Sequence, residues 1–303
     1  MNETQHQKLL PIIDFFNLSS PINIEKLEGH ANDNYVCKTA RGNFLIKNIL
    51  EKQTMHNMLS EITYVEYLSK HSMPVPSYLV SPNGSFIFNN AELTVMVQNV
   101  VPGSNPEITV NNTAQIGKVL GKLHQVPFSQ LPQRSGWFSP EYIKESFVKL
   151  NKEFRGNPSA KKIISLYDSC KEFESNILPD LPTSIIHSDV KSDNVIFHDD
   201  QLAAVVDWAD VIIAPALLDF AIAVGYWCFK DGKIIRESYE ALYKNYTRER
   251  PLTELEVNHM AECMKYVGVV EAVTRFLLWH DEKDYDAIRS LRFGELEASD
   301  FFR

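Results

Sequence analysis

The chain has 303 residues, of which 44% are hydrophobic and 23% are charged. These proportions are ordinary for a folded protein and exclude a disordered or fibrous chain. The formal net charge is −9 and no dense run of lysine and arginine occurs, so we expect no nucleic-acid partner. No internal repeat or Gly/Ser linker is visible, which disfavours repeat architectures and strings of separate domains.

The four cysteines are far apart and form no paired spacing, which argues against a disulfide framework or a zinc site. The amino-terminal stretch lacks a basic start followed by a small-residue cleavage site, so we expect no secretory leader. An apolar stretch runs from residue 211 to residue 229, but Pro215 and Asp219 interrupt it. We expect a buried helix there instead of a membrane span, and therefore a cytoplasmic protein without a membrane partner.

The period of the apolar residues changes along the chain. Up to about residue 101 they fall in short runs with the period of strands. These runs lie at 34–38, 43–49, 85–88 and 93–97. One helix is expected near 55–71, and helical periods return after Pro102 and Gly103, as at 116–123. Residues 185–208 are an exception, because two apolar runs flanking a polar turn predict a hairpin.

This change of period predicts an α+β protein with two lobes. The first lobe is small and β-rich and covers residues 1–101, and the second is larger and α-rich and covers residues 102–303. A cleft between two lobes is the usual place for a ligand.

Residues 187–194 read HSDVKSDN and lie between two apolar runs. Asp189 stands two residues after His187 and Asn194 five residues after Asp189, as in the catalytic loop of kinases. One carboxylate can accept the proton of an attacking hydroxyl, and a nearby amide oxygen can hold Mg²⁺. Asp207 follows the next apolar run, at the position of a second metal ligand.

Each of these polar residues alone would suit a turn before a strand, because aspartate and asparagine are common turn residues. Their combination at this spacing, with apolar strands on both sides, favours the catalytic interpretation.

The set of His187, Asp189, Asn194 and Asp207 resembles the aminoglycoside phosphotransferase and choline kinase family, whose members share a two-lobed protein-kinase-like fold. The resemblance implies that Asp189 is the general base and that Asn194 and Asp207 are Mg²⁺ ligands, with ATP as the phosphoryl donor. It also implies that Lys191 contacts the γ-phosphate. The first lobe would then bind the nucleotide, and the second would bind the acceptor and carry out catalysis.

Residues of the first lobe fit the nucleotide site that this resemblance implies. Lys47 lies on an apolar strand, and Glu61 lies in the apolar face of the following helix, where an unpaired carboxylate would be costly. Lys47 alone would suit an edge strand facing water, but with Glu61 it suits the ion pair of kinases. Gly29 marks the turn expected to cover the phosphates, and adenine is expected against the backbone of Asn99 and Val101.

Four further residues are expected to be structural. Asp219 is a carboxylate within an apolar helix, and by resemblance it binds the backbone of the 187–194 loop. His124 continues an apolar helical face, so a hydrogen-bonded core histidine is a better interpretation than a catalytic one. Gly117 and Gly121, four residues apart, predict close packing of their helix.

The acceptor is expected to be a small molecule. Only eleven residues separate Asp207 from Asp219, and the A-P-E motif of protein kinases is absent. Within the family, the chain most resembles the type II homoserine kinases. The segments that carry this resemblance are residues 29–35, 207–229, 275–276 and 288–293.

Two kinds of acceptor remain open. An amino acid carries a carboxylate, for which Arg275 is the candidate partner, although a surface salt bridge would also explain this arginine. An aminoglycoside carries several ammonium groups, for which acidic residues late in the chain are candidates, although a solvated surface would also explain these. These acidic residues are Glu271, Asp281, Glu282, Asp284, Asp286, Glu295, Glu297 and Asp300.

We therefore expect an ATP- and Mg²⁺-dependent kinase, monomeric or homodimeric, that phosphorylates a hydroxyl group of a small metabolite. Homoserine or a related hydroxy amino acid is the preferred acceptor, and an aminoglycoside or another amino alcohol or sugar is the alternative. A catalytically idle nucleotide-binding regulator is the alternative of another class, which the complete set of motifs disfavours.

Overall fold

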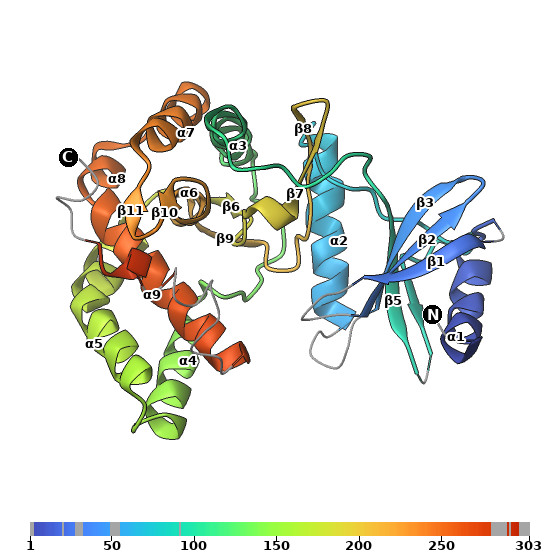
Figure 1. The fold of residues 1–303 in the computed structure, drawn as a ribbon, viewed down its shortest axis with the longest axis horizontal. Helices are drawn as coiled ribbons and strands as arrows, with labels where there is room; N and C mark the ends of the chain where they lie inside the picture. The colour runs from blue at the N-terminus through green and yellow to red at the C-terminus, as the bar shows by residue number, and fades with distance from the viewer. Residues whose placement is uncertain are drawn as a thin grey trace. The chain divides into compact units, whose positions relative to one another are not determined.

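The computed structural model describes residues 3–19, 21–27, 33–48, 55–90, 92–279, 290 and 292–296. The chain divides into two compact units (Figure 1). The first comprises residues 1–103 and 203–209, and the second comprises residues 104–202 and 210–303. None of the helices in the described ranges is both long enough and apolar enough to cross a membrane.

The first unit contains a five-stranded antiparallel sheet with the strand order β1-β2-β3-β5-β4. Its strands are β1 (Pro21–Leu27), β2 (Asp33–Thr39), β3 (Gly42–Asn48), β4 (Ile87–Asn89) and β5 (Thr94–Asn99). Its helices are α1 (Glu3–Phe15) and α2 (Met55–Lys70). A turn at residues 41–42 joins β2 to β3, and Gly42 there has a φ of 134°, which favours glycine.

The helix expected near 55–71 is confirmed as α2, and a further helix that was not expected, α1, precedes the sheet. Pro11 lies within α1, and a proline inside a helix normally opposes helix formation. The helix nevertheless buries Leu9, Ile12 and Ile13 in one hydrophobic cluster with the sheet residues. Burial of these apolar side chains outweighs the local cost of the proline.

The second unit is mainly helical. Its helices are α3 (Val110–Leu123), α4 (Pro140–Glu153), α5 (Pro158–Glu172), α6 (Ala216–Trp227), α7 (Arg236–Glu249), α8 (Glu254–Asn258) and α9 (Met260–Trp279). A π-helical turn (Phe173–Ile177) and two 3₁₀ turns (Leu178–Asp180 and Ser192–Asn194) add to these.

Short strand pairs join the helices of this unit. The strands are β6 (Thr183–Ile186), β7 (Val195–His198), β8 (Gln201–Val205), β9 (Ile212–Pro215), β10 (Phe229–Lys230) and β11 (Lys233–Ile234), and residues 203–205 of β8 belong to the first unit. They pair as β6 with β9, β7 with β8, and β10 with β11. The β7–β8 pair is the expected hairpin, and its turn residues Asp199 and Asp200 both have the positive φ that a type I′ turn requires.

The apolar stretch at residues 211–229 is not one continuous helix, contrary to expectation. Its first part forms β9, which pairs antiparallel with β6, and only its second part forms α6. Pro215 lies at the junction, immediately before α6, and the isoleucines that precede it favour a strand. Because α6 is buried along almost its whole length, its sequence is apolar all round.

Helices α3 and α7 pack closely, as the two glycines of α3 predicted. A Cβ atom on Gly117 would clash with the backbone carbonyl of Leu242, and one on Gly121 would clash with that of Tyr246. The absence of a side chain at both positions therefore lets the two helix backbones approach each other.

Candidate active site

Lys47 is held by two carboxylates in the first unit. Its Nζ lies 3.3 Å from Oε1 of Glu61 on α2 and 3.0 Å from Oδ1 of Asp207, which belongs to the same unit. Tyr78 donates its hydroxyl hydrogen to the same oxygen of Glu61 at 2.5 Å. Three residues that the sequence assigns to the nucleotide and metal sites are thus brought together, although they come from distant parts of the chain.

The two carboxylates keep Lys47 charged. Burial alone would lower the pKa of Lys47, but the charges of Asp207 and Glu61 outweigh this effect and raise the pKa above its ordinary value. Glu61 is fully buried, whereas 51% of the Asp207 side chain is exposed. Asp207 also has a φ of 61°, an uncommon conformation for a residue other than glycine. Its carboxylate therefore remains accessible to a ligand while Lys47 binds one of its oxygens.

The remaining predicted nucleotide residues are less well defined. Asn99 ends β5, where its backbone N–H donates to the carbonyl of Ser77 and its side-chain amide donates to the hydroxyl of Ser77. Val101 follows two residues later and is half-buried. Gly29 lies outside the described residues. The role of these three residues in nucleotide binding stays a prediction.

The 187–194 loop joins β6 to β7 in the second unit and contains a buried carboxylate, that of Asp189. Its Oδ2 accepts a hydrogen bond from Nδ2 of Asn194 at 2.8 Å and lies 2.8 Å from Nζ of Lys191. Its Oδ1 has no hydrogen-bond partner within the part of the chain that the structure describes. One oxygen of Asp189 is therefore held in place, and the other can accept a hydrogen bond from a ligand.

Helix α6 fixes the backbone of this loop, as expected for Asp219. Asp219 is fully buried and accepts the backbone N–H of His187 at 2.7 Å and that of Ser188 at 2.8 Å, one with each carboxylate oxygen. Trp227 donates its indole N–H to the carbonyl of Val190 at 2.7 Å. These bonds hold Ser188 at a φ of 70°, a conformation that costs energy for a serine.

Two more side chains hold the loop from other directions. His187 is buried and its Nδ1 accepts the backbone N–H of Asp189 at 3.2 Å, so it shapes the loop. Asn105 crosses to the far end of the loop, where its side-chain amide donates to three backbone carbonyls. These carbonyls belong to Ser192, Asp193 and Val195.

Asp219 continues into a chain of buried polar groups. Nε2 of His124 lies 3.3 Å from Asp219, and Nδ1 of His124 lies 2.7 Å from the hydroxyl of Tyr246. Arg250 donates to this hydroxyl at 3.1 Å and pairs with Glu256 at 2.8 Å. Burial raises the pKa of Tyr246, so its hydroxyl keeps its proton within this chain. His124 is thus the hydrogen-bonded core histidine that was expected.

Arg275 of α9 lies beside Asp189. Its Nη2 is 3.9 Å from Oδ1 of Asp189 and donates to the hydroxyl of Tyr226, and its guanidinium lies 5.8 Å from the centroid of the Tyr226 ring. Only 3% of the Arg275 side chain is exposed, which excludes a surface salt bridge. Glu271 lies one helical turn earlier, is also buried, and accepts a hydrogen bond from Ser290 at 3.2 Å.

Most of the acidic residues late in the chain cannot be placed. Glu295 is described, and it pairs with Lys162 at the surface, so it belongs to a solvated face. The remaining members lie outside the described residues. They are Asp281, Glu282, Asp284, Asp286, Glu297 and Asp300.

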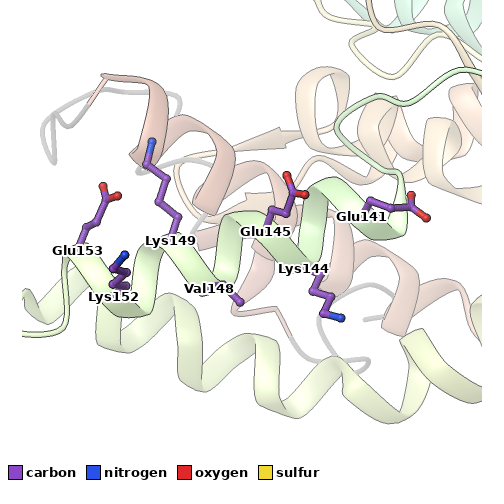
Figure 2. A pocket seen from close by; sticks show the side chains of 7 residues that line it. All are labelled: Glu141, Lys144, Glu145, Val148, Lys149, Lys152 and Glu153. Carbon is purple, nitrogen blue, oxygen red and sulfur yellow. The ribbon is translucent and has the colours of Figure 1, made fainter.

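Figure 2 shows a hollow along α4 whose lining comes from that helix alone. It is lined by Glu141, Lys144, Glu145, Val148, Lys149, Lys152 and Glu153. The charged side chains are of both signs and are spread along the helix, so they offer no convergent set of groups for a ligand. None of them is among the predicted site residues.

Sequence reasoning missed Tyr226 and Asn105. Tyr226 stands near the end of an apolar helix, where a tyrosine hydroxyl needs a polar partner, and this need is a signal that could have drawn attention to it. Asn105 lies in a loop where asparagine is common for local reasons, so nothing in the sequence indicates that it reaches residues more than 80 positions later.

Comparisons with known proteins identify the family and the fold of this chain. Residues 24–252 match the phosphotransferase enzyme family, APH. The match covers most of the chain, which therefore belongs to this family and is a small-molecule phosphotransferase. The family and the protein-kinase-like α+β fold expected from the sequence are thereby confirmed.

One relative is named homoserine kinase and comes from Brucella melitensis biotype 2. It is 25% identical over 256 residues, which cover 83% of this chain and 78% of the relative. An amicoumacin kinase solved in complex with AMP-PNP, Ca²⁺ and Ami has a TM-score of 0.75 at 15% identity, with 97% of this chain and 95% of that chain covered. A microcompartment-associated aminopropanol kinase has a TM-score of 0.71 at 17% identity, with 97% and 94% covered. At these identities the two solved structures establish the fold alone.

Proposed function

We propose that this enzyme transfers the γ-phosphoryl group of ATP to the hydroxyl of homoserine or a related hydroxy amino acid. The observation that carries the proposal is the buried guanidinium of Arg275, 3.9 Å from the carboxylate of Asp189. A buried arginine beside the group that would bind the acceptor hydroxyl suits an acceptor with a carboxylate. The relatives named homoserine kinase support the same acceptor.

Asp189 is the proposed general base. Its Oδ2 is fixed by Asn194 and Lys191, so its Oδ1 can accept a hydrogen bond from the acceptor hydroxyl and take its proton during transfer. Lys191 would contact the γ-phosphate through a further donor of its ammonium group. Direct in-line transfer requires little more than this positioning and the stabilisation of developing charge.

The proposed nucleotide residues are Lys47, Glu61, Gly29, Asn99 and Val101. Lys47 would bind the α- and β-phosphates, and Glu61 would keep it oriented. The backbone of Asn99 and Val101 would contact adenine.

Asn194 and Asp207 are the proposed ligands of Mg²⁺, which would neutralise the phosphates. Their atoms fit a hard cation, since Asp207 has an accessible carboxylate and Asn194 makes its contacts with Asp189 through Nδ2, so that its carbonyl oxygen remains for a metal.

An aminoglycoside or an amino alcohol is the second candidate acceptor. Glu271 favours it, because a buried carboxylate one turn from Arg275 could bind an ammonium group. An amino acid carries both a carboxylate and an ammonium group, so Arg275 and Glu271 could also bind one such acceptor together.

A coupled assay of ADP release with Mg²⁺ and ATP tests the proposal. The acceptors are homoserine and related hydroxy amino acids, choline, methylthioribose and a set of aminoglycosides, and the Asp189→Asn enzyme is the blank. We expect saturable turnover with homoserine or a close analogue. Turnover confined to aminoglycosides or amino alcohols would replace the proposed acceptor. ATP binding without turnover on any acceptor would favour the idle regulator.

A further inference from the structure

Arg275 is held by a tyrosine that the sequence did not single out. Tyr226, near the end of α6, accepts a hydrogen bond from Nη2 of Arg275 on α9, and its ring lies under the guanidinium at 5.8 Å. Helices α6 and α9 pack against each other within the second unit. We propose that Tyr226 positions Arg275 so that the enzyme selects acceptors bearing a carboxylate close to the reacting hydroxyl. This inference rests on the function proposed above.

The two contacts made by Tyr226 fix both the position and the plane of the guanidinium. The hydrogen bond fixes one edge, and the contact between the cation and the aromatic ring opposes tilting of the plane. Arginine has five N–H donors in a planar fork, which allows several hydrogen bonds at once and suits a parallel pair of bonds to one carboxylate. Lysine could not present the same pair of parallel donors.

The contact between Arg275 and Asp189 leaves the base available. A separation of 3.9 Å is longer than a hydrogen bond, and Oδ1 of Asp189 has no such partner among the described residues. The cation is nevertheless close enough to stabilise negative charge beside Asp189. An acceptor could therefore give its hydroxyl hydrogen bond to Asp189 and its carboxylate to Arg275 at the same time.

The short separation limits the shape of the acceptor. Two groups hydrogen-bonded to atoms 3.9 Å apart lie within roughly 10 Å of each other. A short carbon skeleton that carries both the hydroxyl and the carboxylate, as in a hydroxy amino acid, meets this limit.

The charges explain why the position of Arg275 matters. A carboxylate of the acceptor would be repelled by Asp189 unless a cation lay close to both. Lys191 already pairs with the other oxygen of Asp189 at 2.8 Å. Arg275 is the second cation at this carboxylate, and Tyr226 keeps it at the distance where it serves the acceptor without forming its own hydrogen bond to the base.

The test compares two acceptors that differ only in the carboxylate, homoserine and 3-aminopropan-1-ol. We expect Tyr226→Phe to lower the ratio of their kcat/KM values by about tenfold or more, through a higher KM for homoserine, because one hydrogen bond to a charged group is lost. The kcat for 3-aminopropan-1-ol should stay unchanged. Tyr239→Phe is the matched control, because it removes a tyrosine hydroxyl of the same unit that contacts Met260 instead.

A second variant separates positioning from a general loss of structure. In the Arg275→Lys enzyme, adding Tyr226→Phe should change the ratio little, because the residue that Tyr226 positions is already altered. An unchanged ratio in Tyr226→Phe, or equal effects of this change in both backgrounds, would overturn the inference while leaving the proposed function intact. A wild-type enzyme with no preference for homoserine over 3-aminopropan-1-ol would instead overturn both.

Discussion

The two units hold charge clusters of opposite composition. In the first unit one ammonium group, that of Lys47, lies between the carboxylates of Glu61 and Asp207. In the second unit one carboxylate, that of Asp189, lies between the cations of Lys191 and Arg275. Counted over the residues that the structure describes in these contacts, the first cluster has a formal excess of negative charge and the second a formal excess of positive charge.

This difference suggests how the two substrates are divided between the clusters. An excess of carboxylate in the first cluster suits a site that receives a divalent cation together with the phosphates of ATP. An excess of positive charge in the second cluster suits an anionic acceptor and the charge that develops on the transferred phosphoryl group. In the first cluster Glu61 is fully buried, whereas Asp207 remains accessible to a ligand.

Removal of the central carboxylate should have the largest effect. We expect Asp189→Asn to lower kcat by about 10³-fold or more, because the general base is lost while the shape of the side chain is kept. ATP binding, measured by calorimetry, should remain largely intact. Asp193→Asn is the matched control, since it makes the same change at an exposed position of the same loop. An Asp189→Asn enzyme with near-normal turnover would contradict the assignment of the base.

Removal of the central cation of the first unit should affect ATP and stability together. We expect Lys47→Met to lower kcat/KM for ATP by about 10²-fold, as the loss of one group that stabilises charge does in other enzymes. It should also lower the free energy of unfolding by about 3 kcal/mol, because Glu61 is left buried without its cation.

A second substitution separates these two effects. Adding Glu61→Gln to Lys47→Met should restore much of the stability, measured by chemical denaturation, but not the kcat/KM for ATP. Lys38→Met is the control, because Lys38 forms an exposed ion pair on the same sheet. Recovery of ATP kinetics in the double variant would show that Lys47 acts only through stability.

Local spacing made much of the site predictable. The 187–194 loop, the hairpin after it and the pair of Lys47 and Glu61 were all recognised from residues whose roles follow from short intervals in the sequence. Asp219 was recognised because a carboxylate in an apolar helix must find donors, and it does so in the loop backbone.

The parts that escaped prediction depend on contacts between distant residues. Asn105 and Tyr226 act through partners on other elements, and no local pattern names those partners. The chain from His124 through Tyr246 to Arg250 likewise joins helices far apart in sequence. Helix α1 was missed because the local effect of Pro11 was outweighed by burial, and β9 was missed because pairing with β6 decides its conformation.

The central claim is that the positive excess around Asp189 selects an acceptor with a carboxylate, and the Arg275→Gln enzyme tests it most directly. The measurement is the ratio of kcat/KM for homoserine to that for 3-aminopropan-1-ol, with Arg236→Gln as the control at an exposed arginine of the same unit. We predict a fall in this ratio of tenfold to about a hundredfold in Arg275→Gln and no change in Arg236→Gln. A folded Arg275→Gln enzyme that keeps the wild-type ratio would contradict the account.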